Sequence, residues 1–235
     1  MIYLNNAATT WPKPESVYHA VDYYTRYYGA GFGRGNDALA KQSSEVVFDC
    51  RCAIAELFGI QAVERVIFTF NATDAINIAF KGMLEKGDHV IISDMEHNAV
   101  LRPLMKMKES DMIALSIAES DAHGVMHLTE IEKHIRPNTR LIEMIHVSNV
   151  TGAVNDITRI GEMCRCHGIP LMVDASQSAG CYDINVIRDN ISLLALPGHK
   201  GLYGPQGTGI LYVAPDINLD TLREGGTGSG SKSFS

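Results

Sequence analysis

The chain has 235 residues, of which 46% are hydrophobic and 20% are charged, a balance typical of a globular protein with a substantial core. Its net charge of -7, without any run of lysine and arginine, argues against nucleic acid as a partner. No window approaches the roughly 18 unbroken apolar residues of a membrane span, and the first residues, MIYLNNAATT, contain no signal sequence. We therefore expect a cytoplasmic protein with no membrane segment.

Residues 1–14 contain WPKP and predict an extended N-terminal arm. Apolar and aromatic positions at helical spacing predict a helix from Glu15 to about Tyr28 and a second over 38–59, which ends at a glycine. Between them, residues 29–36 repeat G-x-G. Because a helix and not a strand precedes this repeat, we expect an active-site or subunit-contact loop and not a dinucleotide site.

Strands and helices then alternate. We expect strands over 65–70, 89–93, 112–117, 140–147 and 170–174, and helices over 73–83, 99–109, from Thr129, and over 156–167. This alternation indicates an α/β fold with a mostly parallel sheet and helices on both faces. In such a sheet, ligands bind beyond the carboxyl ends of the strands.

The cysteines do not indicate a disulfide framework. An odd number in a cytosolic-looking chain favours free thiols. A C-x-C pair next to His167 lacks the spacing of a zinc site, and we expect no bound metal. The five cysteines are Cys50, Cys52, Cys164, Cys166 and Cys181.

The stretch from Leu193 to Val213 places Lys200 on a glycine-rich connection between two apolar strands. Glycine suits a backbone that approaches a ligand closely. A partly desolvated lysine has the lowered pKa of an amine that forms a Schiff base. The alternative is a surface lysine in a hairpin.

Polar residues follow the other strands. Thr73 follows the first, at a helix N-terminus that suits a phosphate or is an ordinary N-cap. His97 follows the second, as a flat ring for a cofactor or as a simple loop residue. Asn149 follows a later strand, and Asp174 ends the fifth, where packing alone does not explain a buried carboxylate. An anion seat, a ring, an amide, an acid and a lysine together suit pyridoxal phosphate.

At these residues the sequence resembles the class V aminotransferase family, and within it the cysteine desulfurases and selenocysteine lyases. The matching stretches occur in the family's order over nearly the whole chain: NNAATTWPKPE, FTFNATDAIN, SDMEHNAV, HVSNVTGAVNDI, LMVDASQSAG and PGHKGLYGPQGTGILYV. The resemblance implies the large domain of fold type I and pyridoxal 5'-phosphate as the cofactor. It also implies a homodimer that removes sulfur from L-cysteine or L-selenocysteine.

The resemblance also assigns roles. Lys200 resembles the Schiff-base lysine, Asp174 the partner of the pyridine nitrogen, and His97 the stacked ring, with Lys200 and His97 catalytic. The remaining residues resemble cofactor ligands or the lining of the substrate pocket. For the cofactor these are Ala72, Thr73, Asn149, Gln177 and His199; for the substrate they are Ala7, Ala8 and Asn149.

The sequence departs from the family at three points. Pro197 stands where a hydroxyl residue is common, and Asn5 stands where aspartate is usual. The family continues into a small domain that carries the nucleophilic cysteine and the substrate-binding arginine. We thus expect an arm over 1–14, a cofactor domain over 15–225, a truncated end over 226–235, and no turnover by this chain alone. A transaminase, another lyase, an epimerase and a non-catalytic assembly domain remain open.

Overall fold

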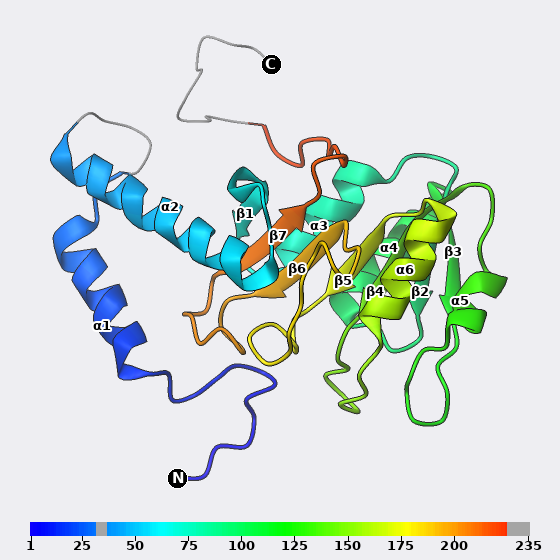
Figure 1. Cartoon of the computed structure of the whole chain (residues 1–235), viewed down its shortest axis with the longest axis horizontal. Helices are drawn as coiled ribbons and strands as arrows, with labels where there is room; N and C mark the ends of the chain where they lie inside the picture. Colours follow the sequence, from blue (N-terminus) through cyan, green and yellow to red (C-terminus); the bar gives the residue numbers. More distant parts are fainter. Residues whose placement is uncertain (32–36, 225–235) are drawn as a thin grey trace.

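Seven strands form one sheet in the order β1-β7-β6-β5-β4-β2-β3 in the computed structural model, which describes residues 1–31 and 37–224 (Figure 1). Every strand predicted from the sequence is present, with ends that differ from the prediction by at most two residues. The strands are β1 Val66–Thr69, β2 Asp88–Ser93, β3 Ile113–Ala118, β4 Thr139–Ile145, β5 Leu171–Asp174, β6 Leu193–Pro197 and β7 Gly209–Val213.

One strand, β7, differs from the expected parallel pattern. The strands from β6 through β5, β4 and β2 to β3 pair in parallel, whereas β7 is antiparallel to both β6 and β1. The chain turns back directly from β6 into β7, and β7 then lies between β6 and β1. Because β1 opposes β7, it runs in the same direction as β6, and its carboxyl end lies at the same edge of the sheet as the others.

Helices cover both faces of the sheet, as predicted. Figure 1 shows α3 (Ala72–Met83) and α4 (Asn98–Glu109) behind the sheet and α6 (Ile157–His167) in front of it, with the short α5 (Leu128–Lys133) beside α6. Every residue of β5 and β6 is buried, because helices cover both faces of these central strands.

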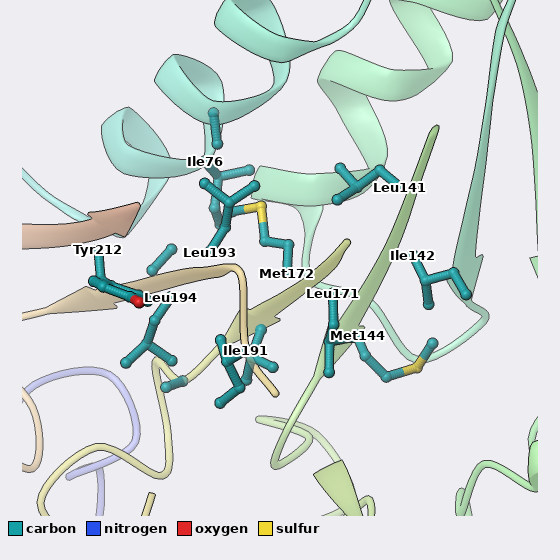
Figure 2. Close-up of a cluster of buried hydrophobic side chains, with 14 of the residues drawn as sticks. Ile76, Leu141, Ile142, Met144, Leu171, Met172, Ile191, Leu193, Leu194 and Tyr212 are labelled. Carbon is teal, nitrogen blue, oxygen red and sulfur yellow. The ribbon is translucent and has the colours of Figure 1, made fainter. Parts of the chain in front are cut away.

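The centre of the core is built from aliphatic residues on adjacent strands. In Figure 2, Leu193 and Leu194 point to opposite sides of β6, and Ile76 of α3 packs on the side of Leu193. Met172 of β5 and Leu141 of β4 continue this layer and are fully buried. This packing fixes the strand ends that carry the candidate site.

The N-terminal helices extend away from the sheet (Figure 1). The predicted helix over 15–28 is an α-helix, α1, only from Glu15 to Tyr23 and continues as a π-helix over Tyr24–Tyr28. Helix α2 (Ala38–Phe58) ends at Gly59 in the left-handed conformation, as predicted, and a 3-10 turn at Val63–Arg65 leads into β1.

Two predictions fall outside the described residues: positions 32–36 of the expected loop over 29–36, and the expected end over 226–235. Within residues 1–31 and 37–224, no helix combines the length and apolar character needed to cross a bilayer.

Candidate active site

The carboxyl ends of the strands open onto a cavity of about 240 Å³. It gathers residues that are distant in the sequence, because the parallel strands all end at this edge. The sequence predicts ten site residues, and all but Ala7 line the cavity. The predicted residues that line it are Ala8, Ala72, Thr73, His97, Asn149, Asp174, Gln177, His199 and Lys200.

Asp174 and Lys200 form the charged centre of this cavity. Asp174 ends β5 with 2% of its surface exposed, and its Oδ1 accepts a hydrogen bond from the backbone N–H of Ser176 at 2.8 Å. Burial raises the pKa of Asp174, and this is opposed by the Ser176 bond and by the charges of Lys200 and His97. Burial also lowers the pKa of Lys200, while the carboxylate of Asp174 opposes that shift. The amine is thus easier to deprotonate than an exposed lysine.

The lysine is held on the connection between β6 and β7. The N–H of Gly198 donates to the carbonyl of Thr208 at 2.9 Å, and the N–H of Gly204 donates to the carbonyl of Gly198 at 2.7 Å. The N–H of Tyr203 donates to the carbonyl of Lys200 at 2.9 Å. These bonds fold the turn back on itself, so Lys200 is not on an open surface hairpin.

Helix α3 begins directly at the cavity. The side chain of Asn71 caps it by accepting from the N–H of Asp74 at 2.8 Å, which makes Asn71 and not Thr73 the N-cap. Ala72 and Thr73 occupy the first turn, where backbone N–H groups lack partners within the helix. Such a helix start is an anion seat.

His97 lies at the start of α4 and is fixed by the helix itself. Its Nδ1 accepts a hydrogen bond from the N–H of Ala99 at 3.0 Å, so the histidine is the N-cap. A ring nitrogen that accepts this bond carries no proton, and the neutral ring therefore bears its proton on Nε2. The cap holds the ring at the cavity wall.

The N-terminal arm closes the side of the cavity next to Lys200. The N–H of Thr10 and the hydroxyl of Thr9 each donate to the carbonyl of His199 at 3.1 Å, and the ammonium of Lys13 donates to the same oxygen at 3.3 Å. The Thr9 hydroxyl also lies 3.0 Å from Nδ1 of His199. Burial, Lys200 and Lys13 lower the pKa of His199.

The arm also contacts the turn after β5. The amide of Gln177 donates through Nε2 to the carbonyl of Ala7 at 3.0 Å. Ala8 lines the cavity. Ala7 does not, but its carbonyl is bonded to Gln177, which does. Asn149 lies exposed at the rim.

A second, larger hollow of about 560 Å³ lies between α3 and α4 and shares Thr73 and His97 with the first. Its other charged lining residues are Lys81, Arg102 and Lys106. We place the site in the smaller cavity because a buried acid and a lysine of lowered pKa meet there.

Comparisons with known proteins identify the family of the chain. The sequence profile described as Aminotransferase class-V matches residues 2–233. The chain belongs to the class V aminotransferase family. A probable cysteine desulfurase of Methanothermobacter thermautotrophicus is 34% identical over 228 residues, which cover 96% of this chain and 56% of that protein.

Solved structures of similar proteins share the fold. The cysteine desulfurase of Thermococcus onnurineus, solved without ligand, superposes with a TM-score of 0.86 at 31% identity, over 92% of this chain and 54% of the other. The protein SspA, solved in complex with cysteine, gives 0.89 at 33% identity, over 96% and 65%. The chain thus spans little more than half the length of the curated relatives it matches.

The residues of this class V domain fit pyridoxal phosphate. The cofactor needs an anion seat, an acid for its ring nitrogen, a flat contact and an amine for its aldehyde. The start of α3, Asp174, His97 and Lys200 lie around one cavity and would supply these four groups. The ionisable groups also suit a functional site. A buried acid beside a lysine of lowered pKa is an arrangement that packing alone does not require.

Sequence reasoning missed several residues that build the site. Ser176 lines the cavity and orients Asp174, Ile145 and Pro197 form apolar wall, and Thr9 and Thr10 hold the lysine turn. An aspartate at a strand end followed two residues later by a serine is typical of a turn in which the carboxylate accepts a backbone N–H, and that pattern could have indicated Ser176. The contact of Thr9 with His199 joins positions 190 residues apart and has no local signal.

None of the chain's five cysteines, all of them in the described residues, lines the cavity. Cys164 lies on the buried face of α6, and burial raises its pKa to about 12, so it is a poor nucleophile. In the part of the chain that the structure describes, no cluster of three or more histidine, cysteine, aspartate or glutamate residues could hold a metal ion.

Proposed function

We propose that this chain is the cofactor-binding domain of a pyridoxal-phosphate enzyme that removes sulfur from L-cysteine or L-selenocysteine. The observation that carries the proposal is the meeting of Asp174 and Lys200 in one cavity with the start of α3 and the ring of His97. Membership in the class V family and the cysteine desulfurase names of its relatives support it. Because the chain covers only 56% of such a relative, the activity proposed is that of the whole protein.

Each residue would bind one part of the cofactor. The first turn of α3, with Ala72 and Thr73, would bind the phosphate through backbone N–H groups and the threonine hydroxyl. Asp174 would hold the proton of the ring nitrogen, and His97 would stack on the ring. Gln177 would bond the phenolic oxygen, with His199 beside the phosphate.

When bound, the cofactor would act as an electron sink for the substrate's α-carbon. The chain's own residues would do the proton chemistry. Lys200 would bind the aldehyde and then, displaced by the amino acid, move a proton at the α-carbon; its lowered pKa favours the neutral amine that this needs. Asp174 would stay ionised and keep the ring nitrogen protonated. Asn149 and Ala8, at the rim, would face the substrate.

The sulfur acceptor lies outside this cavity. Because no cysteine of the chain lines it, the thiolate that accepts sulfur would come from elsewhere in the whole protein or its partner subunit. We expect the protein to act as a homodimer. Supporting this, the helical stretch over 15–28 presents Tyr18, Tyr23 and Tyr27 with 44%, 53% and 60% of their surfaces exposed. Analytical ultracentrifugation of the purified protein tests the dimer.

The cofactor assignment is tested by trapping. The purified chain is incubated with pyridoxal phosphate, reduced with borohydride, digested and mapped by mass spectrometry. We expect one pyridoxyl adduct, on Lys200, and none on this residue in Lys200→Arg. Lys81, which lines the neighbouring hollow, is the matched control: Lys81→Arg should label as the unchanged chain does.

No adduct at saturating cofactor would reject the enzyme and favour a non-catalytic assembly domain. An adduct spread over Lys13 and other lysines would reject the site. Product analysis of the whole protein separates reaction classes: alanine with sulfide supports desulfuration, whereas a keto acid or a racemised substrate would assign a transaminase or an epimerase.

A further inference from the structure

Two buried carboxyl groups lie behind the candidate site, and the proposed chemistry uses neither. Glu143 is on β4 and is completely buried. Glu96 follows β2 and immediately precedes His97; part of the residue is exposed, but its carboxyl group is enclosed. An unpaired buried charge is costly, so each of these groups needs a partner or a proton.

Only one of the two carboxyl oxygens of Glu96 accepts hydrogen bonds. Its Oε1 accepts from the N–H of Ile145 at 2.9 Å and from the hydroxyl of Ser93. Its Oε2 is buried, and so are both oxygens of Glu143, and no donor of the described residues reaches any of the three. Two ionised carboxylates in this setting would repel each other at close range without compensation.

The carboxyl groups of Glu96 and Glu143 are close enough to influence each other's ionisation, and the three buried oxygens without a donor belong to these two groups. A carboxylate has no proton to donate, so a bond between them exists only if one of them is protonated. Burial raises the pKa of both groups, and each is raised further by the charge of Asp174; for Glu143 the charge of Glu96 adds to this. Burial thus favours the protonated form of one carboxyl group, which a hydrogen bond between Glu96 and Glu143 requires.

The pair is tied to the site through the backbone. Ile145, whose N–H donates to Glu96, pairs with Asp174 across β4 and β5 and lines the cavity. Glu143 lies two residues earlier on β4, so it shares the face of Ile145. The titratable groups that face Asp174 are Lys200 and His97 on the cavity side and this pair behind it.

We propose that Glu96 and Glu143 share a proton across a buried carboxyl–carboxyl hydrogen bond, and that this pair positions Asp174 and sets the charge behind it. The consequence for the cofactor rests on the proposed function: a negative charge behind Asp174 would help to retain the proton of the ring nitrogen. Glu96 is then a positioning residue, which acts through Ile145 and Asp174 and does not touch the cofactor.

Carboxyl ¹³C NMR of the cofactor-free chain, with labelled glutamate and aspartate, tests the pair. We expect one glutamate to remain protonated at pH 8, and this signal to disappear in Glu143→Gln, whose amide can donate to an ionised Glu96. In Asp174→Asn, the first proton loss of the pair should move down by at least about one pH unit, because the charge of Asp174 disfavours ionisation of the pair. Glu109→Gln, an exposed change on α4, should leave every one of these midpoints in place.

Ionisation of every glutamate by pH 6 would overturn the shared proton. An unchanged midpoint in Asp174→Asn would overturn the coupling to the site. Because these titrations need no cofactor, they stand even if borohydride traps nothing on Lys200, and an adduct on Lys200 would not rescue a pair that fails them. Circular dichroism confirms that each variant is folded, and Glu96→Gln repeats the test from the other side: it too should lose the glutamate signal of the protonated pair at pH 8.

Discussion

The backbone N–H of Thr10 donates a hydrogen bond to the carbonyl oxygen of His199 at 3.1 Å, and the Thr10 hydroxyl donates to the same oxygen across 189 residues of sequence. The N-terminal arm is therefore part of the wall that holds Lys200. The turn after β6 cannot move outward without breaking these bonds, and helix α1, which follows the arm, buries no residue of its own. Arm and lysine turn should loosen together.

Thr9→Val is expected to weaken cofactor binding without unfolding the chain. The change keeps the shape of the side chain and removes the hydroxyl that bonds the carbonyl and Nδ1 of His199. One such bond contributes about 1 kcal/mol, so the dissociation constant of pyridoxal phosphate should rise about fivefold, measured by absorbance titration. Thr25→Val is the control, because its hydroxyl bonds only within its own helix. Equal affinities of the two variants would contradict a role for the arm.

Asp174→Asn is expected to make Lys200 lose its proton at lower pH. The carboxylate raises the pKa of Lys200 against the lowering effect of burial, so a neutral amide leaves burial unopposed. The pH midpoint for reaction of Lys200 with an amine-directed reagent should fall by about one unit, followed by mass spectrometry of the Lys200 peptide. The midpoint of Lys86, an exposed lysine, serves as the internal standard. An unchanged Lys200 midpoint would mean that the two groups do not interact.

Much of the fold could be predicted because it depends on the local pattern of apolar and polar residues. Apolar runs predict β5 and β6, and polar residues follow each of these strands. This pattern alone predicts that Asp174 and Lys200 lie at one edge of the sheet. The mostly parallel sheet was predicted, but the antiparallel β7 was not, because its position between β6 and β1 depends on how the hairpin packs and not on the alternation of elements.

The supporting contacts of the site could not be predicted. Asn71 and Thr73 are equally good caps in sequence, and the structure selects Asn71 through one hydrogen bond to Asp74. In the sequence, Glu96 is one of several polar residues after a strand, and Glu143 is one polar position among the apolar residues of the next strand but one. Only the meeting of β2 and β4 in the sheet brings the two carboxyl groups together.

Gly209→Ala is expected to disturb the start of α3. Gly209 opens β7, and a Cβ atom there would lie 2.5 Å from the carbonyl carbon and 2.7 Å from the Cα of Asn71, the residue that caps α3. Backbone atoms cannot yield as a flexible side chain does, so the change should cost about 1–3 kcal/mol of unfolding free energy and weaken phosphate binding. Urea denaturation and inorganic-phosphate titration measure the two effects.

Gly31→Ala is the matched control for this change, since a Cβ atom there meets no other atom within 4 Å. It should stay within about 0.5 kcal/mol of the unchanged chain. If Gly209→Ala were as stable as this control and bound phosphate equally well, the helix start would not depend on the close approach of β7.

Glu143→Leu is expected to stabilise the chain, and more at high pH than at low pH. The folded-state pKa of Glu143 lies well above that of an exposed glutamate, because burial and the charges of Glu96 and Asp174 disfavour its ionised form. The unfolded chain therefore releases this proton first as pH rises through about 4.3. From there the folded state binds more protons than the unfolded state, and the carboxyl group lowers stability progressively.

Leucine removes that dependence and fills the buried space with an apolar side chain. The gain in unfolding free energy should be small at pH 5 and reach about 1–3 kcal/mol at pH 8, as for other buried ionisable groups replaced by apolar residues. Glu109→Leu, an exposed change, should show no such rise between the two pH values. A gain that is larger at pH 5 would mean that Glu143 is ionised in the folded chain. It would also remove the physical basis for a proton between β2 and β4.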